Sequence, residues 1–493
     1  MADARGRRRL AIVGGGASGV AAFVAAVRYG VAASIDLIDP VGIGGGVAFS
    51  ARDDALLCNT SVETMSVLDD EQDDFLAYLH SIDVAATRDS FAPRAYVSRY
   101  LTARYRQFAA RARAAGIEHR FVQAAAIRVE GAKAGGYRVL LDDGAVRDAT
   151  DVLLCVGHGA PHVPAEVEPH LGAPLLFESL YPEQDVLAAL RPCSRVLVLG
   201  SRLSAVDSAL LLCEAGHTVE MASPSGRLPA VRTATPRACP VEVDARALAS
   251  VDVNAPGFAW RLLRIIARSA RAVGSRPLRE QVVRVREPIE RMRREADLAR
   301  RGVTDWQQIL VGYMDAAETR LRHEALASQR RALAECSRVA GRYLFACPLQ
   351  NADKLLRYAR ERRLTVRAGT PARLRPGARW RVFWGDGKQD DFDAIVCATG
   401  FRKAPLAGSA TAVTFGAAAP GDAPLCVGSD LRVWFEGAAH PERIWTLGLA
   451  SQPGAPIVNA VYQAVRQAYE LCRAWRADDM TCQSQRSVVE ELE

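Results

Sequence analysis

The stretch Leu10-Ala11-Ile12-Val13-Gly14-Gly15-Gly16-Ala17-Ser18-Gly19, near the N-terminus, decides the fold. Its four apolar residues indicate a short buried strand, and the pattern Gly-x-Gly-x-x-Gly follows at once. An Ala-rich helix over 20–29 and a second strand over 34–38 come next, and Asp39 ends that strand. The order of strand, glycine turn, helix, strand and acid predicts a Rossmann-like unit that binds a dinucleotide.

Each part of this turn has a physical task in such a unit. Gly14 makes the tight turn, Gly16 lets the backbone approach a pyrophosphate, and Gly19 allows close packing of helix on strand. The helix that follows faces the phosphates with its N-terminus. Asp39 can accept hydrogen bonds from ribose hydroxyls. The alternative interpretation is a glycine turn with a structural role only.

A second unit of the same kind begins at residue 195. A strand over 195–199 leads into Gly200-Ser201-Arg202-Leu203-Ser204-Ala205, and a helix and a further strand over 218–222 follow. Arg202 stands where the second glycine belongs, and its guanidinium can meet a phosphate. Ser223 and Arg227 follow the last strand without an acid, which favours NADPH over NADH. The alternative is a Rossmann unit that has kept only its structural role.

Two later segments, 137–157 and 380–400, repeat one pattern. Each predicts a hairpin with an Asp-Gly turn, followed by a buried strand that ends in small residues. The endings, Gly157 and Gly400, let the chain pass close to a bound ligand. The repetition predicts two nucleotide-binding domains, each closed by such a strand.

The length and composition agree with this division. A single hydrophobic core stops growing at about 250 to 300 residues, and this chain has 493. No run of 18 apolar residues exists, so we expect no membrane span. The eleven cysteines form no C-x-x-C pair, and the histidines are irregularly spaced, so we expect no metal site. Glycines interrupt the apolar stretch after Arg7-Arg8-Arg9, which argues against a signal peptide and for a cytoplasmic protein.

The formal charge of +7 is concentrated in one segment. Residues 258–342 contain 19 Arg and no Lys against 10 acidic residues, a charge of +9, which leaves −2 for the rest. The segment is expected to be helical and to cover the second domain, or to act as a lid that recognises acidic groups through Arg320, Arg322 or His323. Nucleic-acid binding is disfavoured because no aromatic platform is interleaved with the arginines.

Beyond the glycines, a series of motifs resembles a known family. The motifs are Asp39-Pro40, Gly42-Ile43-Gly44-Gly45-Gly46, Leu56-Leu57-Cys58-Asn59, Met65-Ser66, Phe91-x-Pro93-Arg94-x-Tyr96, Val156-Gly157-His158-Gly159, Leu228-Pro229 and Ala398-Thr399-Gly400. They resemble two-dinucleotide-binding flavoproteins of the FAD/NAD(P)-binding type, distantly similar to flavin-dependent amino-acid N-monooxygenases and Baeyer–Villiger monooxygenases. The resemblance is fairly specific over the first third of the chain and looser after Gly400.

The resemblance implies an α/β fold with two Rossmann-like domains, the second inserted in the first, and an α-helical insertion. The expected boundaries are 1–180 and 401–476 for a discontinuous FAD-binding domain, 181–257 and 343–400 for an NAD(P)H-binding domain, 258–342 for the Arg-rich insertion, and 477–493 for a C-terminal tail. The helix from about Ile457 would point its N-terminus at the flavin.

The resemblance also implies site residues. The residues expected at FAD are Gly14, Gly16, Ala17, Ser18, Gly19, Asp39, Gly44, Gly45, Gly46, Asn59, Gly157, Gly400 and Gly448. Those expected at NADPH are Gly200, Arg202, Leu203, Ser204, Ser223 and Arg227. Arg94, Arg322 and His323 are candidate substrate residues, and Arg94 has the alternative of a structural ion pair.

The function predicted on this basis is an FAD- and NADPH-dependent monooxygenase that N-hydroxylates an amine or amino acid through a flavin peroxide in a specialised pathway. The expected partners are that small molecule and molecular oxygen, with no nucleic acid and no membrane; a homo-oligomer stays open. One alternative is an FAD-dependent NAD(P)H oxidoreductase without oxygen transfer. The other is a flavin-binding protein whose nicotinamide site has decayed, for which Arg202 is the main support.

Overall fold

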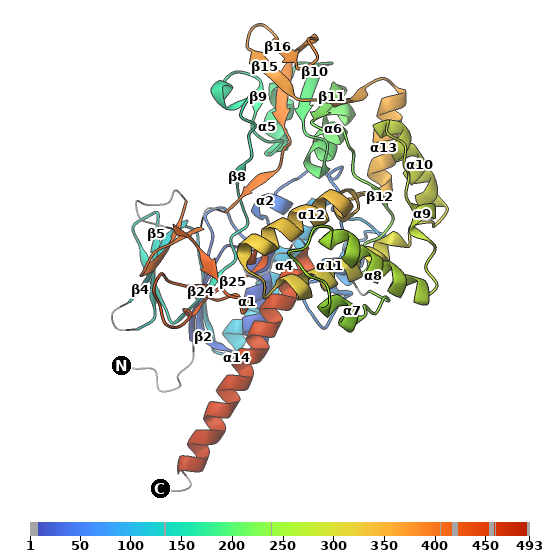
Figure 1. Cartoon of the computed structure of the whole chain (residues 1–493). Helices are drawn as coiled ribbons and strands as arrows, with labels where there is room; N and C mark the ends of the chain where they lie inside the picture. The colour runs from blue at the N-terminus through green and yellow to red at the C-terminus, as the bar shows by residue number, and fades with distance from the viewer. Residues whose placement is uncertain are drawn as a thin grey trace.

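The first Rossmann-like unit is a parallel sheet of five strands in a computed structural model of the chain (Figure 1). The structure describes residues 8–132, 135–237, 239–404, 406–416, 423–452, 458 and 460–490, with side chains to residue 481. In sheet order the strands are β25 (Ile444–Thr446), β7 (Asp151–Leu154), β1 (Arg8–Val13), β2 (Ala32–Ile38) and β3 (Glu118–Val122). Leu10 pairs with Ile35 on one side and Asp151 on the other. The interior strand β7 and residues 10–13 of β1 are buried because both faces of the sheet are covered there. The edge strand β3 is more polar and more exposed.

Helices cover one face of this sheet. They are α1 (Ala17–Tyr29), α4 (Arg94–Ala114) and α14 (Val461–Glu490), with the shorter α2 (Gly46–Phe49), η1 (Val62–Thr64), α3 (Asp74–Ser81) and η3 (Gly448–Ser451). Phe23 of α1, Tyr100 of α4 and Tyr469 of α14 are all buried in one core. Helix α14 continues past this core and projects from the rest of the chain (Figure 1). The segment after residue 477, expected to be a tail, therefore continues a helix to Glu490.

An antiparallel sheet covers the opposite face. Its strands, in sheet order, are β22 (Ala423–Pro424), β20 (Leu406–Gly408), β21 (Ala412–Phe415), β4 (Ala126–Gly131), β5 (Tyr137–Leu141) and β6 (Val146–Ala149). Beside it lie the paired short strands β23 (Cys426–Val427) and β24 (Val433–Trp434). Val129 and Val139 pack on Val13 and Leu154 of the parallel sheet.

The second Rossmann-like unit repeats this arrangement. Its parallel strands, in sheet order, are β14 (Leu364–Ala368), β11 (Thr218–Ser223), β10 (Arg195–Leu199), β18 (Ala394–Cys397) and β9 (Leu176–Phe177). Its helices are η2 (Glu168–His170), α5 (Glu183–Ala189), α6 (Leu203–Glu214) and α13 (Leu349–Arg360). A meander of β15 (Pro371–Arg375), β16 (Trp380–Trp384) and β17 (Gln389–Phe392) covers one face. The expected start of the second domain is residue 181. Strand β9 lies before that residue and nevertheless belongs to the second sheet.

The predicted internal repetition is confirmed. Strands β5 and β6 form an antiparallel hairpin, as do β16 and β17, and the turn glycines Gly144 and Gly387 have φ values of 84° and 81°. Each hairpin leads into a buried parallel strand, β7 in the first unit and β18 in the second. The same local pattern therefore builds the same cover on both sheets.

Two short strands carry the chain between the units. β8 (His158–Pro161) leads out of the first sheet, β19 (Phe401–Lys403) leads back, and the two pair antiparallel. Strand β25 follows all strands of the second sheet in the sequence, and it joins the first sheet beside β7. The α/β fold with two Rossmann-like units, the second inserted in the first, is therefore confirmed.

The Arg-rich segment is helical, but its helices pack into two different cores. Its helices are α8 (Phe258–Ala272), α9 (Leu278–Gln281), α10 (Pro288–Arg300), α11 (Trp306–Leu321) and α12 (Leu326–Leu344), preceded by α7 (Ala245–Ala249). Helices α8, α11 and α12 share a core that includes Phe258 and Tyr313. Helix α10 instead inserts Met292 and Ala296 into the core of the second unit. The paired strands β12 (Val231–Arg232) and β13 (Cys347–Pro348) tie both ends of this region together.

In the described part of the chain, no helix combines the length and the apolar character that crossing a membrane requires.

Candidate functional site

The first glycine turn brings helix α1 against the end of strand β1 with no room for side chains. A Cβ atom on Gly19 would lie 1.7 Å from the carbonyl oxygen of Gly14. Gly14 itself has a φ of 112°, and a Cβ there would lie 2.6 Å from the carbonyl oxygen of Cys155. Both positions therefore exclude any residue larger than glycine for steric reasons.

Gly16 differs because the space beside it is open. A Cβ on Gly16 would meet only the Cα atom of Gly46, at 3.9 Å. Gly16 is the N-cap of α1, and neither a capping side chain nor an acidic residue stands in the first turn, which contains Ala17 and Ser18. The free backbone N–H groups of this turn and the positive end of the helix dipole suit a phosphate. The residues present therefore fit a dinucleotide pyrophosphate.

The carboxylate of Asp39 is engaged within the protein. One oxygen accepts from the backbone N–H of Gly15 at 2.7 Å, and the other accepts from Val41 at 2.8 Å and Gly42 at 2.9 Å. Asp39 therefore joins the glycine turn to the loop after β2. The expected hydrogen bonds to ribose would have to use the remaining lone pairs of these oxygens.

The Gly44-Gly45-Gly46 loop packs between this turn and helix α4. Gly44 donates its N–H to the carbonyl of Gly15 at 2.8 Å, and a Cβ atom on Gly44 would lie 2.7 Å from the backbone oxygen of Ser98. Gly448 lies on the other side, where an added Cβ would stand 2.1 Å from the hydroxyl of Ser18. Gly157 and Gly400 immediately precede the two crossing strands β8 and β19. The predicted FAD residues thus lie around one turn and the domain crossing.

The second glycine turn reproduces the tight steric fit of the first. Gly200 has a φ of 137°, and a Cβ there would lie 2.4 Å from the carbonyl oxygen of Ala398. Ala205 is fully buried at the third glycine position. Helix α6 also starts without a capping side chain or an acid in its first turn, which contains Leu203 and Ser204. The second turn therefore also presents free N–H groups.

The polar residues of the second turn divide into engaged and exposed ones. The buried Ser223 hydroxyl lies 2.7 Å from the Ser201 hydroxyl and accepts from the N–H of Gly226 at 3.0 Å. Ser223 therefore stabilises the loop rather than facing solvent. Arg202 and Arg227 are exposed, and the Arg202 guanidinium lies 5.9 Å from the ring centre of Phe345.

A cavity of about 530 Å³ lies between the two units and the helical insertion. Each of the three parts contributes a lining residue. Phe49 follows the Gly44-Gly45-Gly46 loop, Leu203 begins helix α6, and Tyr313 comes from α11. The walls are mainly apolar; their apolar members include Met65, Trp306, Leu310, Val311, Met314, Leu333, Leu344, Phe345 and Val461. Most of a small ligand's contact area in protein sites is apolar, with a few placed polar groups.

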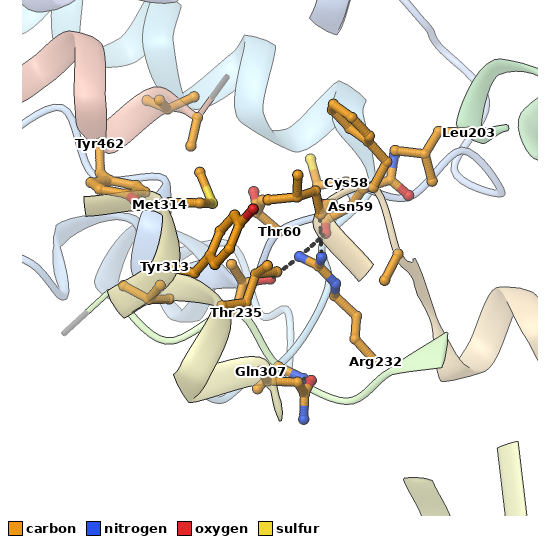
Figure 2. Close-up of a pocket in the computed structure, with 18 of the residues that line it drawn as sticks. Cys58, Asn59, Thr60, Leu203, Arg232, Thr235, Gln307, Tyr313, Met314 and Tyr462 are labelled. Carbon is orange, nitrogen blue, oxygen red and sulfur yellow. Dashed lines mark hydrogen bonds between the residues drawn. The ribbon is translucent and has the colours of Figure 1, made fainter. Parts of the chain in front are cut away.

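Few polar groups enter this cavity. The buried side-chain oxygen of Asn59 makes no hydrogen bond within the described structure, and the buried hydroxyl of Tyr313 lies beside the Cys336 thiol. Arg232 lies beside Asn59, with Thr235 and Gln307 nearby (Figure 2). Burial raises the pKa of the Cys58 thiol, which also lines the cavity, to about 12. Cys58 is therefore a neutral thiol at pH 7.

Arg94 lines the cavity but is held by an ion pair between the two units. Its guanidinium contacts the buried carboxylate of Asp207 on α6 at 2.5 Å and donates to the Tyr181 hydroxyl at 2.7 Å. Burial opposes the charge on Arg94, but Asp207, Tyr181 and Cys58 together outweigh it, and the pKa of Arg94 is raised. These contacts favour the structural alternative, because the anion that Arg94 needs is supplied by the protein.

Arg322 and His323 lie elsewhere. Both are exposed at the C-terminal end of α11, and Arg322 lies 3.6 Å from the Glu318 carboxylate. Neither belongs to the described residues that line the cavity, and both border a separate surface depression next to Cys426. They do not contribute to this cavity, and their expected role at a substrate stays a prediction. The surface that Arg322 and His323 face depends on their position at the end of α11, and the charge of a residue does not predict that position.

Sequence reasoning missed Arg232, Gln307 and Tyr313. Arg232 follows the Leu228-Pro229 motif by a few residues, but no local pattern marks it as buried. Gln307 and Tyr313 come from the insertion, whose apolar spacing predicts a helix without predicting what it faces. Ile457 lies outside the described residues, and α14 begins at Val461 beside the cavity. Among the described residues, no group of three metal-ligating side chains gathers anywhere.

Comparison with known proteins agrees with this architecture. Residues 11–159 match the family described as FAD-NAD(P)-binding. No curated protein sequence matches the chain. The fold is similar to that of ornithine N-hydroxylase from Kutzneria sp. 744, at a TM-score of 0.60 and 14% identity, covering 96% of this chain and 99% of that one. It is also similar to L-lysine 6-monooxygenase from Pseudomonas syringae, at a TM-score of 0.52 and 16% identity, with coverage of 96% and 99%.

Two alanine substitutions three residues apart should separate folding from binding. Gly19→Ala should lower the free energy of unfolding by about 3 kcal/mol or more, because its methyl group meets backbone that cannot move away. Gly16→Ala should leave stability nearly unchanged and reduce the FAD content, because its methyl group enters the open space. Urea unfolding of the cofactor-free proteins and the flavin-to-protein absorbance ratio measure the two effects. Equal destabilisation by both variants would contradict this assignment.

Removing the Arg94 side chain should destabilise the junction between the units. Arg94→Ala leaves the carboxylate of Asp207 buried without its cation, which costs about 3 to 5 kcal/mol. The matched control is Arg88→Ala, which removes an exposed partner of Asp73 and should leave the free energy of unfolding nearly unchanged. Urea unfolding compares them. Similar small losses for both would mean that the Arg94 pair does not hold the units together.

Proposed function

We propose that this protein is an FAD- and NADPH-dependent monooxygenase that hydroxylates the nitrogen of a small amine or amino acid. The observation that carries the proposal is one mainly apolar cavity that reaches both glycine-turn units. Phe49 lines it from the side of the first unit, and Leu203 lines it from the first turn of α6. A nicotinamide and a flavin held by these two turns would both reach this space.

FAD belongs at the first turn in this proposal. The N-terminal turn of α1 with Gly16, Ala17 and Ser18 would hold the pyrophosphate, and Gly44 to Gly46 would lie alongside. Asn59, which lines the cavity, would lie beside the flavin. When bound, FAD supplies the redox chemistry, accepting hydride and reacting with oxygen.

NADPH belongs at the second turn. The free N–H groups at the start of α6 suit its pyrophosphate, and the exposed Arg202 replaces the missing glycine with a positive charge. The exposed Arg227 stands just after β11, where no acid would repel a 2′-phosphate. Ser223 would act indirectly, by fixing the loop that carries Arg227.

The insertion gives the cavity a wall against water. Leu310 and Met314 of α11 and Leu333 and Leu344 of α12 all line it. Apolar walls strengthen electrostatic interactions at a reacting group and limit its exposure to solvent. We therefore assign the insertion the role of covering the site.

The cysteines argue against a thiol-based reductase. Cys58 and Cys336 line the cavity, and burial raises the pKa of Cys58 to about 12 and that of Cys336 to about 11. Only the thiolate is an effective nucleophile in disulfide exchange. Neither side chain is ionised near neutral pH, so neither is an effective nucleophile there.

The proposal predicts that the FAD-loaded protein consumes NADPH and oxygen and forms a hydroxylated nitrogen. Anaerobic NADPH should bleach the flavin absorbance, and in air an accepted amine should lower the hydrogen peroxide released per NADPH. The product is identified by a mass increase of one oxygen atom, labelled when ¹⁸O₂ is used. Hydrogen peroxide equal to the NADPH consumed with every amine offered would favour an oxidoreductase without oxygen transfer. No bleaching by NADPH or NADH would contradict both enzymes.

A further inference from the structure

Arg232 is a buried arginine whose charge is balanced by no ion pair within the described structure. Its side chain is 4% exposed and lines the cavity from strand β12. It donates to the Tyr343 carbonyl at 2.7 Å, to the Leu344 carbonyl at 3.0 Å and to the Thr235 hydroxyl at 2.9 Å, with a longer contact to the Asn59 carbonyl at 3.4 Å. All four acceptors are neutral. Its Nε–H is buried and has no acceptor among the described residues.

The described residues that line the cavity around Arg232 offer no compensating charge. Among the described residues that line the cavity, none is Asp or Glu, whereas Arg94, Arg232 and Lys403 are cationic. Asp207 already neutralises Arg94. Burial lowers the pKa of Arg232 to about 10, yet a guanidinium stays protonated at pH 7. A buried unpaired charge is costly, and an anion in the cavity would offset that cost.

A second unsatisfied group lies beside the guanidinium. The side-chain oxygen of Asn59 is buried without a hydrogen bond to the described residues, and Figure 2 shows Asn59 next to Arg232. That oxygen accepts an N–H, whereas the guanidinium donates to an anion. The two together fit a molecule that carries a carboxylate and an N–H group. Beyond them the walls are largely apolar, so the rest of that molecule meets side chains such as Trp306 and Leu310.

We propose that the cavity binds a substrate with a carboxylate and an apolar body, and that Arg232 holds the carboxylate. This inference rests on the proposed function and names its substrate class. It differs from the amino acids in the names of the two similar structures, ornithine and lysine, which carry a second amine. A side-chain ammonium would find Lys403 and Arg232 in this cavity and no acidic partner among its described lining residues.

The phosphates of a bound dinucleotide are the other source of an anion. We favour the substrate because each glycine turn already offers a phosphate its own uncapped helix start, at α1 and at α6. Arg232 lies on a different strand, fixed to the end of α12 by its bonds to the carbonyls of Tyr343 and Leu344. Ligand titrations and cofactor measurements separate the two sources.

The wild-type test uses matched probes on the oxidised, FAD-loaded protein. 3-Phenylpropionate, its neutral amide and L-ornithine are titrated at pH 7.5, and binding is followed by the change in flavin absorbance. The carboxylate should bind at least about tenfold more tightly than the amide, because it gains a charged hydrogen bond in a buried site. Equal binding of acid and amide, or tighter binding of L-ornithine, would overturn the proposal. This result does not depend on NADPH oxidation, so it stands apart from the test of the monooxygenase.

Variants then assign the effect to Arg232. Arg232→Gln should remove the preference for the carboxylate over the amide, and Arg232→Lys should retain part of it, because the positive charge remains. The matched control is Arg237→Gln, which changes a largely buried arginine five positions away that pairs with Asp69 at 3.1 Å and does not line the cavity. It should keep the wild-type preference.

Cofactor measurements on the same variants exclude the other source. Arg232→Gln should retain the wild-type FAD content and the wild-type dependence of flavin reduction on NADPH concentration. Loss of FAD, or a tenfold weaker response to NADPH with the carboxylate preference intact, would overturn the proposal and assign Arg232 to a cofactor phosphate. If Arg232→Gln does not fold, the wild-type and Arg232→Lys titrations decide.

Discussion

The contact between the backbone of Gly14 and the Cα atom of Gly19 is the constraint on which the rest of the structure depends. With no side chain at Gly19, helix α1 starts directly against the C-terminal end of β1. Its first N–H groups are left free at that end of the sheet. Any larger residue would push the helix away and turn those groups elsewhere. The carboxylate of Asp39 then anchors the following loop to the same turn through Gly15.

The second unit is equally tight at Gly200, where a Cβ would lie 2.4 Å from the carbonyl oxygen of Ala398, although Ala205 replaces the third glycine. The two units meet through a buried ion pair rather than an apolar interface alone. Arg94 belongs to α4 of the first unit and Asp207 to α6 of the second, and both are largely buried. A buried pair is stable only when its geometry is kept. This pair and the crossing strands β8 and β19 therefore restrict how the two turns face each other across the cavity.

The arginines of this molecule lie in two different environments, the exposed surface and the buried interior. Most arginines of the helical insertion lie at the surface, where pairs such as Arg293 with Glu290 contribute little to stability. Arg232, on strand β12, is instead buried among neutral acceptors beside the C-terminal end of α12. The overall charge of +7 therefore says less about the protein's ligands than the location of this single guanidinium.

Local patterns in the sequence determined the elements of this protein: both glycine turns, the two Asp-Gly hairpins and the helical character of the insertion. They could do so because tight turns and close packing demand glycine at fixed spacing, and that demand is local. Only the tertiary structure decided what these elements face. It paired Arg94 with Asp207, turned Arg322 and His323 to the surface, and buried Arg232 beside Asn59. Such contacts join residues far apart in the chain, and no spacing along the sequence encodes them.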